Sequence, residues 1–401
     1  MIYDCILAGA GASGLFFAAS APRRTKGIIL EKTGRAGTKL LMSGSGQCNI
    51  THSGPIKDFI PKYCENGPAV RRCLYRYSNS SLVDFLRSGG IATVARDDGK
   101  IFPLSMEAED IRSFLMERSA QNGFTFKYDT PLTAISSDPC GWKVLSGSRS
   151  FLTKSLVLAA GGCSYPATGS DGNLFSVLAR DLELEIVPPA PALCPVIPES
   201  YPYGELTGIS FENVRITVFR RGKKISENTG DLLFTESNLS GPAVLDISRN
   251  IMPGDTVMIN YLFPAGFEEV FARLKSADHG SKKEFASLIR GTTNLPARFC
   301  RSIAQRYGPS LKKAAACLTG ETFTVKELSG FRKAMATRGG VSLSEIDTSS
   351  MELRRFPGIF VIGEMCDVDG ATGGYNLQFA YSSARAAAES LFFCSTCAMM
   401  L

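Results

Sequence analysis

Three glycines near the start of the chain have the spacing of a loop that binds a dinucleotide. Gly9, Gly11 and Gly14 form a G-x-G-x-x-G motif that follows the apolar run 2–8 and precedes a segment of small residues. The first glycine permits a tight turn, the second lets the backbone approach a pyrophosphate, and the third lets a helix pack on the strand. The N–H groups at the start of that helix bind the pyrophosphate. We therefore assign the pyrophosphate to Gly9, Gly11, Ala12, Ser13 and Gly14.

An acidic residue stands where such a unit holds a ribose. Residues 27–30 are apolar, and Glu31 follows them, at the distance from the motif, about 20 residues, where an acid accepts hydrogen bonds from ribose hydroxyls. Strand, glycine loop, helix, strand and acid occur in the order that the motif requires. The sequence thus predicts a nucleotide-binding βαβ unit.

Two later segments favour FAD over NAD as the tightly held cofactor. Residues 155–162 read SLVLAAGG, and residues 358–364 read GIFVIGE. They resemble the second and third fingerprints of flavoproteins with two dinucleotide-binding domains, in which the acid of the last strand binds the ribityl chain. The sequence has no second G-x-G-x-x-G, so it predicts no separate NAD(P)H site. The residues assigned to FAD from these segments are Ala160, Gly161, Gly162, Gly363 and Glu364.

A glycine-rich turn follows Glu364 and precedes a helix of small residues at 375–393. The N-terminus of that helix can aim N–H groups at the N1 and O2 edge of a flavin, where negative charge accumulates on reduction. The alternative is that the glycines serve only a tight turn. On the first interpretation the cofactor site also includes Asp367, Gly373, Gly374, Tyr375, Asn376 and Leu377.

Histidine and cysteine limit the other kinds of chemistry. The chain has two histidines, His52 and His279, too few for the usual zinc-hydrolase sites, and we predict no metal site. The twelve cysteines are scattered, which suits reduced thiols in a cytoplasmic protein. The C-x-x-C at 394–397 lies at the C-terminus, away from any thioredoxin-like helix start. Cys48 is of more interest because it lies in the glycine- and serine-rich segment 38–49, expected to be a loop.

Composition indicates a soluble globular protein of several domains. The 401 residues are 44% hydrophobic and 20% charged. No stretch has the length of a membrane span, and Asp4 and the early glycines argue against a signal peptide, so we expect no membrane association. The net charge of +6 is concentrated: residues 267–333 hold thirteen Lys and Arg against six Asp and Glu, and residues 215–224 add five cations without an acid. Such clusters either bind nucleic-acid phosphates or form a solvated surface.

A proline-rich segment divides the chain. Residues 187–198 carry five prolines, which cannot continue a helix or a central strand. Residues 208–246 alternate like antiparallel strands, and 264–331 read as helical. We expect an α/β fold in which a split, Rossmann-like FAD-binding domain is interrupted by an inserted β-rich and helical portion. The expected parts are 1–190 and 335–401 for the FAD domain, 191–263 for the β-rich insertion, and 264–334 for the basic helical insertion.

The whole chain resembles the BaiN/RdsA-type NAD(P)/FAD-dependent oxidoreductases. The resemblance rests on the segments LMSGSGQCNIT (41–51), IFPLS (101–105), AAGGCSYPATGSDG (159–172), GDLLFTESNLSGPAVLDIS (230–248), GGVSLSEI (339–346) and GEMCDVDGATGGYNLQFAYSSA (363–384). It implies a glutathione-reductase-like FAD-binding domain that is interrupted by a β-barrel-like domain and a small helical domain, which agrees with the boundaries above. The chain departs from the family pattern at Gln47 (usually arginine), Glu236 (usually histidine) and 350–354. The resemblance adds Lys32, Lys39, Ser43, Gly44 and Asn49 to the expected FAD-binding residues.

The same resemblance implies three substrate classes: unsaturated bile-acid ketosteroids, aminoacetone, and a uridine of 23S ribosomal RNA that is reduced to dihydrouridine. We favour the uridine, with NAD(P)H as donor, because positive charge is concentrated in the inserted regions. Hydride would pass from flavin N5 to C6 of the base, and Cys48 is our candidate acid for C5. One alternative is a small-molecule reductase or oxidase whose pocket is lined by Tyr165 and residues 238–241. Another is a non-catalytic protein that holds FAD and binds RNA.

Overall fold

A computed structural model describes residues 1–278 and 284–393, which form two compact units. One unit contains residues 1–190 together with the chain after Ala334, and the other contains Pro191–Ala334. The C-x-x-C at 394–397 and His279 lie outside the described residues.

The first unit is built on a mixed sheet in the order β18-β19-β20-β9-β1-β2-β6, with the hairpin β7-β8 beside β9. The five central strands β20, β9, β1, β2 and β6 run parallel. The sheet strands are β1 (Ile2–Ala8), β2 (Gly27–Leu30), β6 (Phe124–Lys127), β7 (Ala134–Asp138), β8 (Gly141–Ser146), β9 (Arg149–Leu158), β18 (Ile346–Asp347), β19 (Glu352–Leu353) and β20 (Ile359–Val361).

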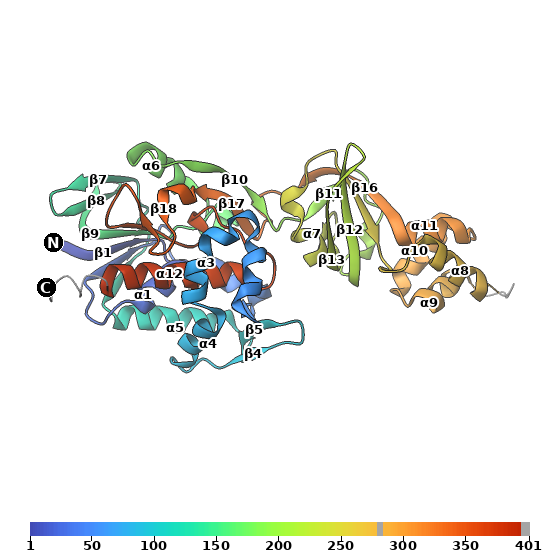
Figure 1. Ribbon diagram of the computed structural model, residues 1–401, viewed down its shortest axis with the longest axis horizontal. Coiled ribbons are helices and arrows are strands. Elements are labelled where there is room, and N and C mark those ends of the chain that lie inside the picture. Colours follow the sequence, from blue (N-terminus) through green and yellow to red (C-terminus); the bar gives the residue numbers. More distant parts are fainter. Residues whose placement is uncertain (279–283, 394–401) are drawn as a thin grey trace. The chain divides into compact units, whose positions relative to one another are not determined.

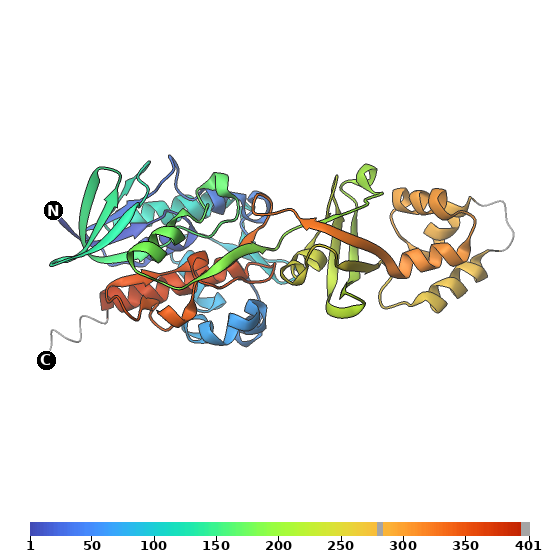
Figure 2. The same ribbon diagram turned by 90° about the horizontal axis from the view of Figure 1, so that it is seen from above.

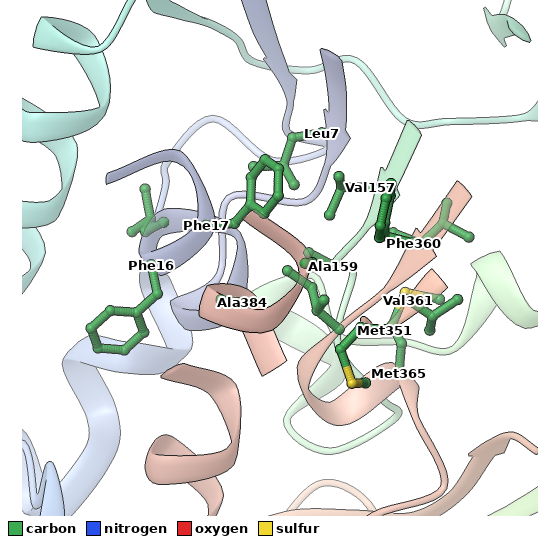
Figure 3. Close-up of a cluster of buried hydrophobic side chains, with 14 of the residues drawn as sticks. Leu7, Phe16, Phe17, Val157, Ala159, Met351, Phe360, Val361, Met365 and Ala384 are labelled. Carbon is green, nitrogen blue, oxygen red and sulfur yellow. The ribbon is translucent and has the colours of Figure 1, made fainter. Parts of the chain in front are cut away.

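The predicted βαβ unit is confirmed. β1 leads into α1 (Ala12–Ser20) and pairs with β2 so that Ile6 lies opposite Ile28. Almost every residue of α1 is buried, because it packs against α5 (Ala108–Gln121) and α12 (Tyr375–Phe393) as well as the sheet. The core joins distant parts of the sequence: Figure 3 shows side chains of β1, β9 and β20 beside Met351, Met365 and Ala384.

Smaller elements surround this sheet. A three-stranded sheet, β3-β5-β4, lies in the same unit, and β10 pairs with β17 in a separate ribbon. Their bounds, with the remaining helices, are α2 (Thr38–Met42), β3 (Thr51–His52), α3 (Gly67–Arg76), α4 (Asn79–Arg87), β4 (Thr93–Ala95), β5 (Lys100–Pro103), α6 (Asn173–Asp181), β10 (Ile186–Ala192) and β17 (Ala336–Val341).

One expectation for this half of the chain needs correction. The segment 38–49 is not wholly a loop, because its first five residues form α2. β6 pairs with β2, whereas β7 and β8 pair with each other. The proline-rich segment is extended, because β10 has only one neighbouring strand and so tolerates residues without an N–H donor.

The second unit is a closed antiparallel barrel with a group of helices. The strand order is β11-β14-β13-β12-β15-β16. The strands are β11 (Val196–Pro198), β12 (Ser210–Arg220), β13 (Lys223–Phe234), β14 (Leu239–Ser240), β15 (Thr256–Asn260) and β16 (Glu321–Leu328), and the helices are α7 (Pro242–Leu245), α8 (Phe267–Ala277), α9 (Phe285–Thr293), α10 (Ala297–Tyr307) and α11 (Leu311–Gly320).

The helices α8 to α11 are an insertion between the last two strands of this barrel. β16 follows α11 directly, pairs with β15, and pairs with β11 to close the barrel (orange in Figure 2). The expectation that 264–331 is helical throughout is therefore wrong for 321–328. Thr322 and Thr324 are exposed while Phe323 and Val325 are buried, which is the two-residue period of a strand. No helix in the described part of the chain is long and apolar enough to cross a membrane.

Candidate functional site

The glycine motif forms a cradle in which two glycines are required by the chain and one is not. Gly9 has φ +106°, and a Cβ there would lie 2.5 Å from the carbonyl oxygen of Ala159. A Cβ on Gly14 would overlap the carbonyl oxygen of Gly9. A Cβ on Gly11 would come no nearer than 4.0 Å to a protein atom outside its chain neighbours. The chain thus leaves space over Gly11, where the motif brings a pyrophosphate.

The start of α1 suits an anion. Gly11 is the N-cap residue of α1, and no side chain caps the helix there. The N–H groups of the first turn, which include those of Ala12 and Ser13, therefore need a partner other than a capping side chain. A pyrophosphate fits both the charge and the space.

Glu31 lies directly after β2, as predicted, and its carboxylate is buried. Oε2 accepts a hydrogen bond of 2.9 Å from the backbone N–H of Ala10, and Oε1 accepts 2.8 Å bonds from the N–H and hydroxyl of Thr33. These bonds fix the carboxylate beside the glycine loop and leave acceptor capacity for a ribose hydroxyl.

The loop 163–172 lies against Glu31 and carries an orphaned polar atom. A Cβ on Gly169 would lie 3.8 Å from Oε1 of Glu31. The neighbouring hydroxyl of Ser170 is buried and lacks a hydrogen-bond partner among the described residues, and it faces Gly161. An ion pair of 2.5 Å between Lys32 and Asp171 ties the loop to the end of β2. A buried hydroxyl without a partner is expected where a polar ligand binds.

Glu364 is the centre of a cluster that the sequence did not predict. Its Oε2 lies 2.6 Å from Nζ of Lys39. Its Oε1 accepts bonds of 2.6 Å from the hydroxyl of Ser164 and 2.8 Å from the N–H of Thr337. Lys39 also donates to Ser164. The structure thus joins three predicted segments, and Ser164 and Thr337, which lie in or beside the family-like segments, are additional site residues.

The loop containing Ser43, Gly44 and Asn49 lies beside the N-terminus of α12. In the amide orientation that satisfies both groups, Asn49 donates to the carbonyl of Thr51 at 3.0 Å and accepts from the N–H of Gly374 at 3.2 Å. Thr51 also donates to Gln378 of α12 at 2.7 Å. Two predicted FAD-binding segments are therefore in direct contact.

The turn before α12 needs its glycines for the chain itself. Gly373 and Gly374 have φ of +119° and +95°, and a Cβ on Gly374 would lie 2.7 Å from Cα of Thr51. Asn376 closes the turn with two 2.8 Å hydrogen bonds to the backbone of Gly370. Asp367 accepts from the N–H of Gly339 at 2.9 Å. These residues build the turn and brace it against β17.

Tyr375 and Leu377 belong to the packing of α12. The Tyr375 ring is buried and stacks on His52, with ring centroids 5.6 Å apart. Leu377 is half-buried against the core of the first unit. His52 is held by the carbonyls of Ser53 and Asp98.

Cys48 is a buried thiol with φ +59°. Burial raises its pKa to about 11, although a hydrogen bond with Ser43 opposes the shift. The thiol therefore keeps its proton at neutral pH. The preceding residue, Gln47, accepts a 2.7 Å hydrogen bond from the guanidinium of Arg96, which also lies over the ring of Phe102. Arg96 and Gln47 thus form one polar group beside the Cys48 loop.

The residues expected to line a small-molecule pocket belong to different units of the chain. Tyr165 directly follows Ser164 in the first unit, whereas residues 238–241 belong to the second unit. Cys163 is half-buried and Cys366 is buried, and burial raises the pKa of both thiols. No group of three or more metal-ligating side chains that could hold an ion occurs in 1–278 or 284–393.

Comparison with known proteins bears on this site. The HI0933-like protein Rossmann domain matches residues 3–390. A ribosomal RNA dihydrouridine synthase of Escherichia coli (strain K12) is 30% identical over 97% of this chain and 98% of its own length. A 3-dehydro-bile acid delta(4,6)-reductase of Clostridium scindens is 27% identical over 95% and 98%.

Solved structures share the fold at low sequence identity. A quinol fumarate reductase of E. coli has a TM-score of 0.53 at 15% identity, covering 99% of this chain and 71% of its own. A 3-ketosteroid delta1-dehydrogenase of Sterolibacterium denitrificans has a TM-score of 0.52 at 10% identity, covering 97% and 99%. The fold is thus a Rossmann-type FAD-binding domain combined with a closed barrel.

Proposed function

The chain belongs to the HI0933-like Rossmann family of flavoprotein oxidoreductases, and from that premise we propose that it uses FAD and NAD(P)H to reduce a conjugated C=C bond, with a uridine of 23S ribosomal RNA as acceptor. The observation that carries the choice of acceptor is the match, over almost the whole of both chains, to the E. coli ribosomal RNA dihydrouridine synthase. A second such synthase, of Haemophilus influenzae, is 29% identical over 96% of this chain.

The first unit supplies the residues that would hold FAD. The free N–H groups at the start of α1 would take the pyrophosphate, and Glu31 the ribose. Lys39, Ser164 and Glu364 form a fixed set of polar groups that would hold the ribityl chain. Bound FAD supplies hydride transfer, while the protein provides orientation and electrostatics.

Exposed cations of the second unit support an RNA acceptor. The β12–β13 hairpin ends in exposed Arg221, Lys223 and Lys224. Lys224 is paired with Glu227, and Arg220 with Asp255, so not all of the hairpin charge is available to phosphates. We propose Arg221 and Lys223 as phosphate contacts of this hairpin.

The proton for C5 of the base needs an acid, and we propose Cys48. Its raised pKa keeps the thiol protonated over the physiological range, as a proton donor requires. Its loop contacts the start of α12 through Asn49. The backbone N–H of Cys48 donates a 2.9 Å hydrogen bond to the carbonyl of Ser43, which holds the backbone of Cys48 in place.

A small-molecule acceptor is the second candidate, because the bile acid reductase matches over nearly the same length. The deciding experiment compares ribosomal RNA, by nucleoside mass spectrometry, from cells with the gene, without it, and with the gene restored. Loss and return of one dihydrouridine supports the proposal, and unchanged RNA contradicts it. Anaerobic mixing with NADH and with NADPH tests the donor: a flavin that bleaches with neither would favour a non-catalytic FAD-holding, RNA-binding protein.

A further inference from the structure

A pocket of about 500 Å³ opens in the second unit between α10, α11, the start of β16 and residues 199–202. All of its lining residues belong to Pro191–Ala334. Its size falls in the range of pockets that take small ligands, about 300–1,000 Å³. No residue predicted to bind FAD lines it.

One wall of the pocket contains a buried carboxylate, that of Glu321, which accepts several hydrogen bonds from protein side chains. Glu321 is 7% exposed, and its two oxygens accept 2.7 Å hydrogen bonds from the hydroxyls of Tyr203 and Tyr261. Both terminal nitrogens of Arg306 donate to Oε1 at 3.0 Å. Because Glu321 has so many partners, it needs no ligand of its own, and it fixes the guanidinium of Arg306.

Arg306 in turn positions a flat aromatic surface. Its Nη2 donates to the hydroxyl of Tyr307 at 2.9 Å, and its guanidinium carbon lies 5.0 Å from the centre of the Tyr307 ring. Planar guanidinium and aromatic groups of this kind stack on nucleobases. The hydroxyls of Thr322 and Thr324 and the ammonium of Lys313 also line the pocket.

The helices α9 to α11 carry basic residues and no acidic ones. Residues 285–320 contain six Lys and Arg and no Asp or Glu. Arg301, Lys312 and Lys313 are exposed, and none of the three forms an ion pair within the described part of the chain. Unneutralised cations around a concave site attract a polyanion.

We propose that this pocket binds one nucleotide of a single-stranded RNA segment, with the base against Tyr307 and Arg306 and a phosphate near Lys313. The inference rests on the proposed function, in which RNA is the acceptor. Glu199, which also lines the pocket, disfavours a free phosphate but can accept a hydrogen bond from a ribose hydroxyl. An acidic peptide would use the cations and leave the flat surfaces and hydroxyls unused.

The test measures binding of fluorescein-labelled decauridylate to the full-length, FAD-loaded protein by anisotropy across salt concentrations. Tyr307→Leu should weaken binding about tenfold, whereas Tyr307→Phe, which keeps the ring, should bind like wild type. Lys313→Gln should reduce the slope of log K against log salt by about 0.7, the contribution of one phosphate contact on a single strand. Lys143→Gln, an exposed lysine of β8 in the other unit, is the matched control and should change neither quantity.

Photocrosslinking locates the contact directly. Decamers containing 4-thiouridine should label the tryptic peptide 307–312, which follows Arg306 and ends at Lys312. If the wild type binds the decamer and the Tyr307→Leu and Lys313→Gln variants bind it equally well, the proposal for this pocket is overturned and the proposed function is not. Equal affinity for decaglutamate would also overturn it. A wild-type protein without salt-dependent RNA binding would contradict the proposed function itself.

Discussion

Nζ of Lys39 lies 2.6 Å from Oε2 of Glu364, although 325 residues separate the two in sequence. The side chains are 25% and 22% exposed, so the ion pair is largely shielded from water. It links α2, which follows the βαβ unit, to the segment that returns after the insertion. The two halves of the proposed FAD site are thereby held together by charge as well as by the shared core.

This pair should show measurable energetic coupling. A double-mutant cycle of Lys39→Met and Glu364→Gln in the apoprotein, followed by urea unfolding, should give a coupling energy of about 1–2 kcal/mol. The control is the exposed pair Lys154–Asp4, at 2.8 Å with side chains 67% and 40% exposed, whose coupling should stay below about 1 kcal/mol. Equal couplings for the two pairs would contradict a structural role for the shielded one.

The glycine cradle gives a second prediction that separates binding from folding. Gly14→Ala should lower the free energy of unfolding by about 1–3 kcal/mol, because its Cβ would overlap the carbonyl of Gly9. Gly11→Ala should leave apoprotein unfolding nearly unchanged and weaken FAD binding at least about tenfold. Flavin fluorescence on titration measures the second effect. A Gly11→Ala variant that binds FAD as tightly as wild type would argue against a pyrophosphate at this loop.

Sequence patterns predicted those elements of the fold that are determined by residues close together in the sequence. The run before Gly9, the small-residue helix and the apolar segment before Glu31 each occupy their predicted element, because glycine spacing and apolar runs act over a few residues. The alternation in 208–246 correctly predicted the antiparallel strands β12 and β13 for the same reason, but 242–245 form the helix α7.

Features that depend on distant partners were missed. β16 follows a helix without a break, and only its pairing with β11 and β15 makes it a barrel strand. Ser164 and Thr337 became site residues only when folding brought them to Glu364, 200 and 27 residues away. Side chains that converge from separate segments leave no spacing signal in one sequence.

Cys48 offers a test of the proposed acid. Cys48→Ser should abolish dihydrouridine formation while FAD stays bound and NAD(P)H still bleaches the flavin, because only the proton donor is lost. Single-turnover assays with ribosomal RNA, beside flavin absorbance, measure both quantities. Cys163→Ser, at a half-buried thiol that we give no proton-transfer role, is the control. Full activity in Cys48→Ser would reject the assignment.

The same thiol should make stability fall at alkaline pH. Burial raises the pKa of Cys48 from 9.0 to about 11, so between these values the folded protein binds a proton that the unfolded chain has released. The free energy of unfolding contributed by Cys48 is complete below pH 9 and is lost as pH rises through 11. Relative to Cys48→Ala, wild type should lose about 2–3 kcal/mol over that interval. Urea unfolding of both proteins at pH 8, 9.5 and 11 measures this loss. If the free energies of unfolding of wild type and Cys48→Ala change in parallel with pH, the raised pKa of Cys48 is contradicted.

The barrel network around Glu321 should respond differently to single and paired substitution. Arg306→Leu leaves a carboxylate that is 7% exposed without its counterion, and should lower the free energy of unfolding by about 3–5 kcal/mol. Tyr261→Phe removes one hydrogen bond to that charge and should cost about 1.5–3 kcal/mol. Replacing both Arg306 and Glu321 by Leu removes the buried charge with its partner, so the double variant should be more stable than Arg306→Leu alone. Thermal and urea unfolding of the three variants give the comparison. A double variant less stable than Arg306→Leu would mean that Glu321 stabilises the barrel through its tyrosines independently of Arg306.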